Sequence, residues 1–159
     1  MPTEVTEQWL ACQIVEQLRR ELNRNKTNCY EVEAIGAGEI PVTSGADFIL
    51  QVCFGSSEAA NPDEQSIEYC PVTVDVQVGI VVSIHLDQHG KVTTLLTDEN
   101  RGLRALARKV KKALIGFDPG GKLAGLMTWR VTDPPAYSDR QKVGWRTLHF
   151  SATYDECLD

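Results

Sequence analysis

The stretch "VTVDVQVGIVVSIHL", Val72 to Leu86, carries an aliphatic residue at every second position. Successive side chains of a β-strand point to opposite faces, so this alternation predicts a strand with one buried face. A straight strand of this length spans about 50 Å, whereas ordinary strands have roughly 3–10 residues. Gly79 lies in its middle, where an isolated glycine often marks a bulge or bend. The unusual length is the feature to explain.

The composition is that of an ordinary folded protein. The chain has 159 residues, of which 42% are hydrophobic, and a net charge of −6. We expect a single domain over residues 1–159 that buries a core without disulfides or metals. The net charge disfavours nonspecific nucleic-acid binding by the chain as a whole. Its five cysteines are scattered without a CxxC pair, which indicates reduced thiols in a cytosolic protein. Because signal-peptide features and long apolar runs are lacking, we expect a soluble protein.

Two segments show the 3.6-residue periodicity of amphipathic helices. The first is "TEVTEQWLACQIVEQLRRELNRN", with Thr3 as a plausible N-cap. The second is "TDENRGLRALARKVKKALIG", which Thr97 or Asp98 would cap and Gly116 would end. Their apolar stripes consist of Ala11, Ile14, Val15, Leu18 and Leu22 in the first segment, and Leu103, Leu106, Ala107, Val110 and Leu114 in the second.

Four further segments alternate as strands do, and polar segments separate them. The predicted strands lie in "CYEVEAIG", "DFILQVCFG", "LMTWRVTD" and "WRTLHFSATY", the last two forming a hairpin. We expect a polar surface loop over residues 56–69, a polar connection in "PPAYSDRQKVG", and a loose tail over residues 155–159. The fold class is therefore α+β, with an antiparallel or mixed sheet, two amphipathic helices packed on one face, and a long strand or hairpin arm.

No catalytic or metal-binding pattern stands out. His85 and His89 flank Asp87 at the entry to a glycine turn, and the glutamate of the HExxH zinc pattern is absent. His149 lies on the outer face of its strand as a satisfied or exposed histidine. We therefore expect no enzyme activity, no cofactor and no metal, although a small enzyme with a dispersed site remains an alternative.

The second helix carries the most distinctive charged feature, a row of basic residues opposite its leucines. The row consists of Arg101, Arg104, Arg108, Lys111 and Lys112. It is interpreted as a solvated face, as a subunit contact for the acidic loop that contains Asp63 and Glu64, or as a DNA contact. This helix lacks aromatic residues that would stack on the bases of single-stranded nucleic acid. Asp75, Gln77 and Gly79 of the long strand are further candidates for a subunit or partner interface.

The order of these parts resembles the phage tail-terminator, or tail-completion, proteins, which include the lambda-type minor tail protein U and Mu-like relatives. The pieces that carry the resemblance are "DFILQVCFGSS", the long strand, "KKALIGFDPGGKLAGLMTWRVTDPP" and "VGWRTLHFSATY". The resemblance spans about residues 4–155, and the polar insert Ser56–Tyr69 has no match in it.

The resemblance implies a homo-oligomeric ring, a hexamer, that caps the last tail-tube ring and ends tube polymerisation. Its partners would be further copies of itself, the tail-tube protein and a head-completion or neck protein. It would reside at the head-proximal end of the virion tail after assembly in the host cytoplasm, without cofactor, membrane or specific nucleic acid. Alternatives are another neck, head-completion or tube-attachment protein, or a nucleic-acid-binding protein that uses the basic helix face.

A ring also suggests a reason for the long strand. If the strand bends near Gly79, one half belongs to its own sheet and the other projects as an arm that pairs with a neighbouring copy. On this hypothesis the apolar ladder exceeds what one copy can bury. The alternative is a long, coiled strand wrapped around its own helices.

Overall fold

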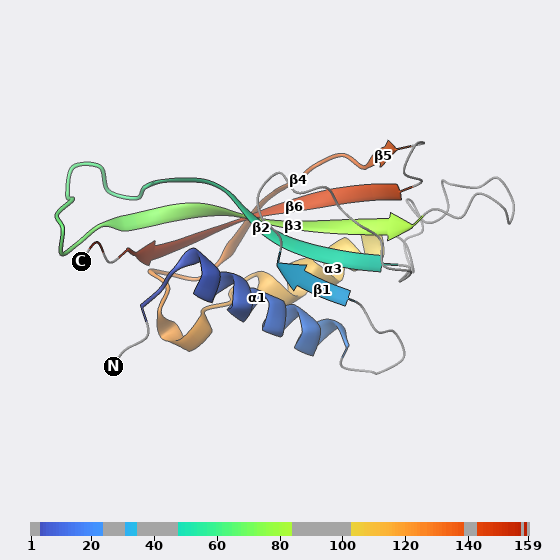
Figure 1. The fold of residues 1–159 in the computed structure, drawn as a ribbon, viewed down its shortest axis with the longest axis horizontal. Coiled ribbons are helices and arrows are strands. Elements are labelled where there is room, and N and C mark those ends of the chain that lie inside the picture. Colours follow the sequence, from blue (N-terminus) through green and yellow to red (C-terminus); the bar gives the residue numbers. More distant parts are fainter. Residues whose placement is uncertain are drawn as a thin grey trace, which may run out of the picture.

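The fold is a mixed β-sheet with two helices packed on the same face of it (Figure 1). The computed structural model of the protein describes residues 4–23, 31–34, 48–83, 103–138, 143–156 and 158. The expected α+β fold with both helices on one face is confirmed. The helices are α1 (Glu7–Leu22) and α3 (Leu103–Leu114), and the strands in these residues are β1 (Glu31–Ala34), β2 (Phe48–Ala59), β3 (Pro71–Ser83), β4 (Thr128–Thr132), β5 (Ala136–Ser138) and β6 (Val143–Asp155).

The described strands follow the order β1-β2-β3-β6-β4, and β5 pairs with β6 on the same edge as β4. β1 runs parallel to β2, and the other strand pairs are antiparallel. A short 3₁₀ turn, η1 (Pro119–Gly121), lies between α3 and β4. The three long strands β2, β3 and β6 cross the whole molecule, as Figure 1 shows.

The predicted long strand is β3, the centre of the sheet. β3 pairs with β2 along one edge and with β6 along the other, without a register break along β6. The expected bulge at Gly79 is wrong, since Gly79 pairs in register with Gln51 and with Thr147. The irregularity lies instead in β2, between Phe54 and Ser57.

The expectation that the apolar ladder needs a second copy is also wrong for the described part of β3. The alternating aliphatic side chains that the structure describes on this strand are buried in the protein's own core, namely Val72, Val74, Val76, Val78 and Ile80. Both edges of the strand are paired within the same chain, so residues 71–83 form no projecting arm. The rest of the predicted strand and the turn with His85 and His89 lie outside the described residues.

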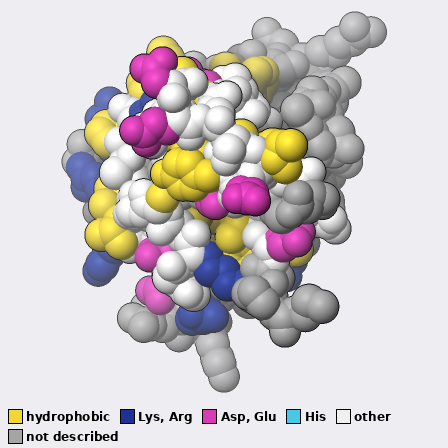
Figure 2. Space-filling model, turned by 90° about the vertical axis from the view of Figure 1, so that its left-hand side faces the viewer, with side chains coloured by type: hydrophobic (Ala, Val, Ile, Leu, Met, Phe, Trp, Pro, Cys, Tyr) yellow, Lys and Arg dark blue, Asp and Glu magenta, His cyan; other side chains and the backbone are white. Residues whose placement is uncertain are grey.

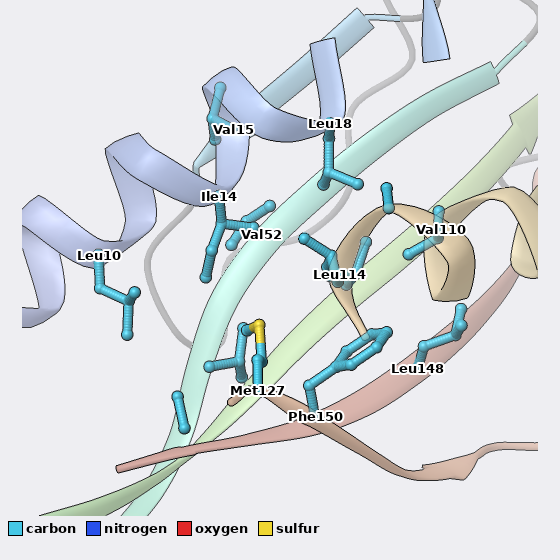
Figure 3. Close-up of a cluster of buried hydrophobic side chains, with 14 of the residues drawn as sticks. Leu10, Ile14, Val15, Leu18, Val52, Val110, Leu114, Met127, Leu148 and Phe150 are labelled. Carbon is cyan, nitrogen blue, oxygen red and sulfur yellow. The ribbon is translucent and has the colours of Figure 1, made fainter. Parts of the chain in front are cut away.

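The core fills the space between the two helices and the sheet (Figure 3). Leu10, Ile14 and Leu18 point from α1 toward Leu114 of α3 and toward the sheet, and all four are fully buried. The predicted helix stripes are confirmed where side chains are described, which excludes Leu103. On β6 the buried residues are Leu148, Phe150, Ala152 and Tyr154, as the alternation of that strand predicts.

The helix ends follow local hydrogen bonding. The N-cap of α1 is Thr6, whose Oγ1 accepts a hydrogen bond from the N–H of Trp9 at 3.1 Å. Thr3, the predicted cap, lies outside the described residues. Gly116 stops α3 as predicted, with φ of 82°, and its N–H donates to the carbonyl of Met127 at 2.9 Å. Thr97 and Asp98 lie outside the described residues.

Three polar segments are more ordered than their composition suggests. β2 continues through Ala59, so the loop expected over residues 56–69 begins later. The "PPAYSDRQKVG" connection contains β5, and Asp155, expected in the tail, ends β6 opposite Pro71. In each case pairing with a long neighbouring strand overrides weak local strand propensity.

Phe150→Ala should lower the free energy of unfolding by about 3–5 kcal/mol, because it opens a cavity at the fully buried centre of the core. Chemical denaturation followed by circular dichroism measures this change at fixed protein concentration. Leu126→Ala is the control, since Leu126 is 63% exposed and its loss should change stability by less than about 0.5 kcal/mol. Equal effects of the two substitutions would contradict the described core.

Candidate functional site

On the sheet face opposite the helices, His149 of β6 is held between two carboxylates. Its Nδ1 lies 3.2 Å from Oδ1 of Asp75 on β3, and its Nε2 lies 2.8 Å from Oδ2 of Asp133, just after β4. We call these three residues the polar clamp. Ionised carboxylates only accept hydrogen bonds, so the imidazole satisfies both when each ring nitrogen carries a proton. The clamp therefore links β3, β6 and the residue that follows β4 through the imidazole ring of His149.

The surroundings of His149 favour this protonated form. Burial by itself lowers the pKa of His149, but the hydrogen bonds to Asp133 and Asp75 and the charges of both carboxylates more than offset it. The net result is a pKa above the ordinary value of 6.5. The side chains of His149 and Asp75 are 17% and 14% exposed, so solvent screens the interaction only in part. The prediction of an outer-face, satisfied histidine is confirmed.

The hydrogen bonds of the polar clamp hold neighbouring strands together. Since both ring nitrogens of His149 are engaged, neither is available to take a proton from a substrate. Gln77 donates from Nε2 to Oδ2 of Asp75 at 2.9 Å and accepts from Sγ of Cys53 at 3.7 Å. Burial and the charge of Asp75 raise the pKa of the Cys53 thiol, which disfavours the nucleophilic thiolate.

Gly55 makes room for the polar clamp at the irregular point of β2. A Cβ atom at position 55 would lie 2.5 Å from Oδ2 of Asp75 and 2.6 Å from Nε2 of Gln77. By contrast, a Cβ at Gly79 would meet only the carbonyl oxygen of Gln51, at 3.8 Å. The closer approach is therefore at position 55, where a side chain would force the ends of Asp75 and Gln77 to shift. Asp75 and Gln77, candidates for a subunit interface, both have partners within their own chain.

A cleft of about 520 Å³ lies between α3 and β4. We call it the basic cleft because five cationic side chains and no acidic one line it. Three of the five predicted basic residues meet there, whereas Lys112 is exposed outside the lining and Arg101 lies outside the described residues. The lining consists of Arg104, Ala107, Arg108 and Lys111 from α3, Trp129, Arg130, Val131 and Thr132 from β4, and Arg146 from β6.

Trp129 supplies the aromatic surface that the helix itself lacks. Nζ of Lys111 lies 3.7 Å from the centroid of the Trp129 ring, a cation–π contact. The indole N–H of Trp129 donates to Oγ1 of Thr132 at 3.0 Å. Sequence reasoning placed Trp129 on a strand but missed its position beside the basic helix, because only the pairing of β4 with β6 brings the two together.

β4 forms an open border of the sheet beside the cleft. Among the described strands it pairs with β6 alone, and its Trp129 and Val131 side chains are 39% and 47% exposed. Arg130 joins this border to the polar clamp, since its Nη1 lies 3.8 Å from Oδ1 of Asp75. An unpaired strand edge with exposed apolar side chains is a common place for another chain to bind.

The loop between β2 and β3 presents the opposite charge at one end of the molecule. We call residues 61–69 the acidic loop. All its residues are exposed, including Asp63, Glu64 and Glu68, and so are the apolar side chains of Ile67 (67%) and Tyr69 (45%). Figure 1 shows it at the far left, and Figure 2 looks onto this end, where acidic and hydrophobic side chains lie side by side.

Two features are absent from the described residues, a metal-binding cluster and a membrane-spanning helix. These residues contain no group of three or more His, Cys, Asp or Glu side chains arranged to hold a metal ion. Neither described helix is long and apolar enough to cross a membrane. The polar clamp, the basic cleft and the acidic loop are thus the features that a function has to explain.

No protein-family model and no curated protein matches the sequence. Among solved structures, the fold is similar to that of a chain in the virion of a native gene transfer agent (GTA) particle, with a TM-score of 0.54 and 19% sequence identity. The similarity covers 92% of this chain and 94% of that chain. It therefore describes a fold shared along nearly the whole length of both proteins.

His149→Gln should cost more stability at about pH 6 than at about pH 9. The pKa of His149 is raised in the folded state, so its stabilising contribution is complete below the unfolded pKa and is lost as the pH rises through the folded pKa. Thermal unfolding of both proteins at both pH values measures the difference. A loss of stability that does not change with pH, or an NMR-measured pKa of His149 below 6.5, would contradict the charged clamp.

Gly55→Ala should lower the free energy of unfolding by about 1–3 kcal/mol, because the new methyl group displaces Asp75 from the polar clamp. It should also lower the NMR-measured pKa of His149, which depends on that carboxylate. Gly79→Ala is the matched control on the neighbouring strand and should be neutral or stabilising by up to about 1 kcal/mol. If position 79 proved the more sensitive of the two, the assignment of the close approach would be wrong.

Proposed function

We propose that the protein is a structural component of a phage-like virion and acts there as a tail terminator. In this role copies form a ring, a hexamer, that caps the tail tube, ends its polymerisation and offers a surface to the head. The observation that carries the proposal is the fold shared, over nearly the full length of both chains, with a component of a GTA virion. The order of sequence motifs that resembles tail-completion proteins supports the finer role.

The described side chains favour a scaffold over an enzyme. The one histidine they include has both ring nitrogens engaged, and the neighbouring Cys53 thiol has a raised pKa. The polar clamp therefore has a structural role, because it fixes β3, β6 and the end of β4 relative to one another. We propose a protein without catalytic activity or cofactor.

The proposed partners are further copies of the chain, the tail-tube protein on one face of the ring, and a head-completion or neck protein on the other. The location is the head-proximal end of the tail. A different neck component is the second candidate, because the shared fold by itself is equally compatible with a neighbouring position in the particle.

Removal of the gene from the producing cell should yield overlong tail tubes without heads, because nothing stops polymerisation. Negative-stain electron microscopy of released tails measures their lengths, and plasmid-borne wild-type protein should restore a narrow length distribution. Normal-length tails without heads would instead favour the neck component. Complete particles of normal length would rule out both roles.

A further inference from the structure

We propose that a cavity between the start of α1 and the end of β6 binds the side chain of an arginine on a partner protein. Both elements reach the same end of the molecule (Figure 1), and the cavity has a volume of about 430 Å³. We call it the glutamate cavity, and its lining consists of Glu4, Val5, Thr6, Glu7, Gln8, Tyr154 and Glu156. The inference rests on the proposed function for the kind of partner, another protein of the particle.

The charge of the glutamate cavity favours a cationic occupant. Three carboxylates line it, those of Glu4, Glu7 and Glu156, and none of the described side chains in the lining is cationic. The N-terminus of α1 adds roughly half a positive charge, which offsets only a small part of the three negative charges. Lys122 is held outside the lining, with its Nζ 5.2 Å from the ring centroid of Trp9. A cation that enters the cavity therefore meets net negative charge.

The hydroxyl group of Tyr154 is a second, independent feature that points to a ligand. Tyr154 is only 2% exposed, yet its hydroxyl has no hydrogen-bond partner among the described residues. Every fully buried side-chain oxygen or nitrogen of these residues does have a partner, so the Tyr154 hydroxyl has to open onto the cavity that it lines. A nearly buried hydroxyl without a protein partner is a position where a ligand or a water molecule is expected.

The raised pKa of Tyr154 indicates that its hydroxyl lies near two of the carboxylates. Burial raises this pKa, and the negative charges of Glu7 and Glu156 raise it further, to about 12. The phenol is therefore protonated at neutral pH, and its oxygen can accept a hydrogen bond from a ligand. A guanidinium group only donates hydrogen bonds, so the carboxylates and this oxygen together supply the acceptors that it needs.

An arginine side chain fits this set of acceptors better than a lysine side chain does. Its planar guanidinium carries five N–H donors that can bind several carboxylates at once, whereas the lysine ammonium has three donors and is more strongly hydrated. The aliphatic part of the arginine side chain can pack on Val5, which is half-buried in the cavity lining. We therefore expect arginine to bind more tightly than lysine.

A different protein is favoured over a second copy of the chain as the source of the arginine. The chain has a net charge of −6, so two copies repel one another at long range. Acidic side chains are spread over the end of the molecule that Figure 2 faces, which is the end where β6 finishes. A basic segment of a partner protein is attracted to this end by charge complementarity. A second copy is the alternative that the test has to exclude.

The test is an NMR titration of the whole, isotope-labelled protein. The probe is the peptide acetyl-Gly-Arg-Gly-amide, and two matched peptides carry lysine or the neutral, similarly shaped citrulline in place of arginine. The cavity variants are Tyr154→Phe and the double variant Glu7→Gln with Glu156→Gln. The control, Glu16→Gln with Glu64→Gln, removes the same charge from exposed positions outside the lining. Circular dichroism and thermal unfolding establish that each variant is folded.

The arginine peptide should bind saturably and shift the amide signals beside the cavity. Tyr154→Phe should weaken this binding at least about threefold and the double variant at least about tenfold, whereas the control should stay within about twofold of wild type. The citrulline peptide should not bind, and the lysine peptide should bind more weakly. Tyr154→Phe should unfold at the temperature of wild type or higher, because it removes a hydroxyl without a protein partner.

The double variant also tests the geometry of the cavity without any peptide. The NMR-measured pKa of Tyr154 should fall in this variant, because two negative charges near the hydroxyl are removed. An unchanged pKa would show that the hydroxyl does not face these carboxylates, and it would overturn the site as described.

Three results of the titration would overturn the proposal. Without saturable binding of the arginine peptide, the cavity holds water only. Equal binding of the citrulline or lysine peptide, or equal weakening in the control, would exclude recognition of a guanidinium in this cavity. Light scattering tests the source, since self-association of wild type that the double variant loses would assign the arginine to a second copy.

These outcomes are independent of the tail-length experiment. Overlong tails together with no binding of the arginine peptide would remove the site alone. Specific binding of the peptide together with complete particles of normal length would remove the proposed function alone.

Discussion

The fold depends on the confinement of β3, which is paired along both edges and buried along one face. β2 and β6 satisfy its backbone hydrogen bonds, while its alternating valines pack under α1 and α3. A strand held on three sides has only its outer face left for other tasks. Asp75 and Gln77 lie on that face and belong to the polar clamp and its surroundings. Surfaces available to other molecules are consequently at the periphery, at the β4 border and the acidic loop.

The periodic parts of the fold could be predicted from the sequence, because periodicity records which face of an element is buried. The alternation around Val76 and the stripe through Leu106 and Leu114 locate a strand and a helix without knowledge of their partners. The hypothesis of a projecting arm is wrong because it considered the long strand without the strands that pair with it. β6 is as long as β3 and β2 is one residue shorter, but the polar residues near Glu58 conceal the extent of β2.

The candidate sites depend on register, which local patterns do not encode. Asp75 and His149 meet across 74 positions of sequence, and the basic cleft combines residues from α3, β4 and β6. Similarly, Gly55 and Gly79 look alike as isolated glycines in strands. Only their cross-strand neighbours show that Gly55 is the one against which side chains press. The basic row on α3 was identified from the sequence, whereas Trp129 could be added only from the structure.

The place of β6 at the end of the sequence also determines when the basic cleft can form. β6 follows the other described strands in the chain, and its pairing with β3 joins residues as distant as Thr73 and Thr153, which are 80 positions apart. Pairings of such long range are intrinsically slow to form, because the entropy of closing the intervening loop opposes them. The basic cleft contains Arg146 of β6 and the strand β4 that pairs with it, so it cannot exist on a nascent chain that still lacks β6. A chain that still lacks β6 therefore has neither a complete lining of this cleft nor a partner for the second edge of β3.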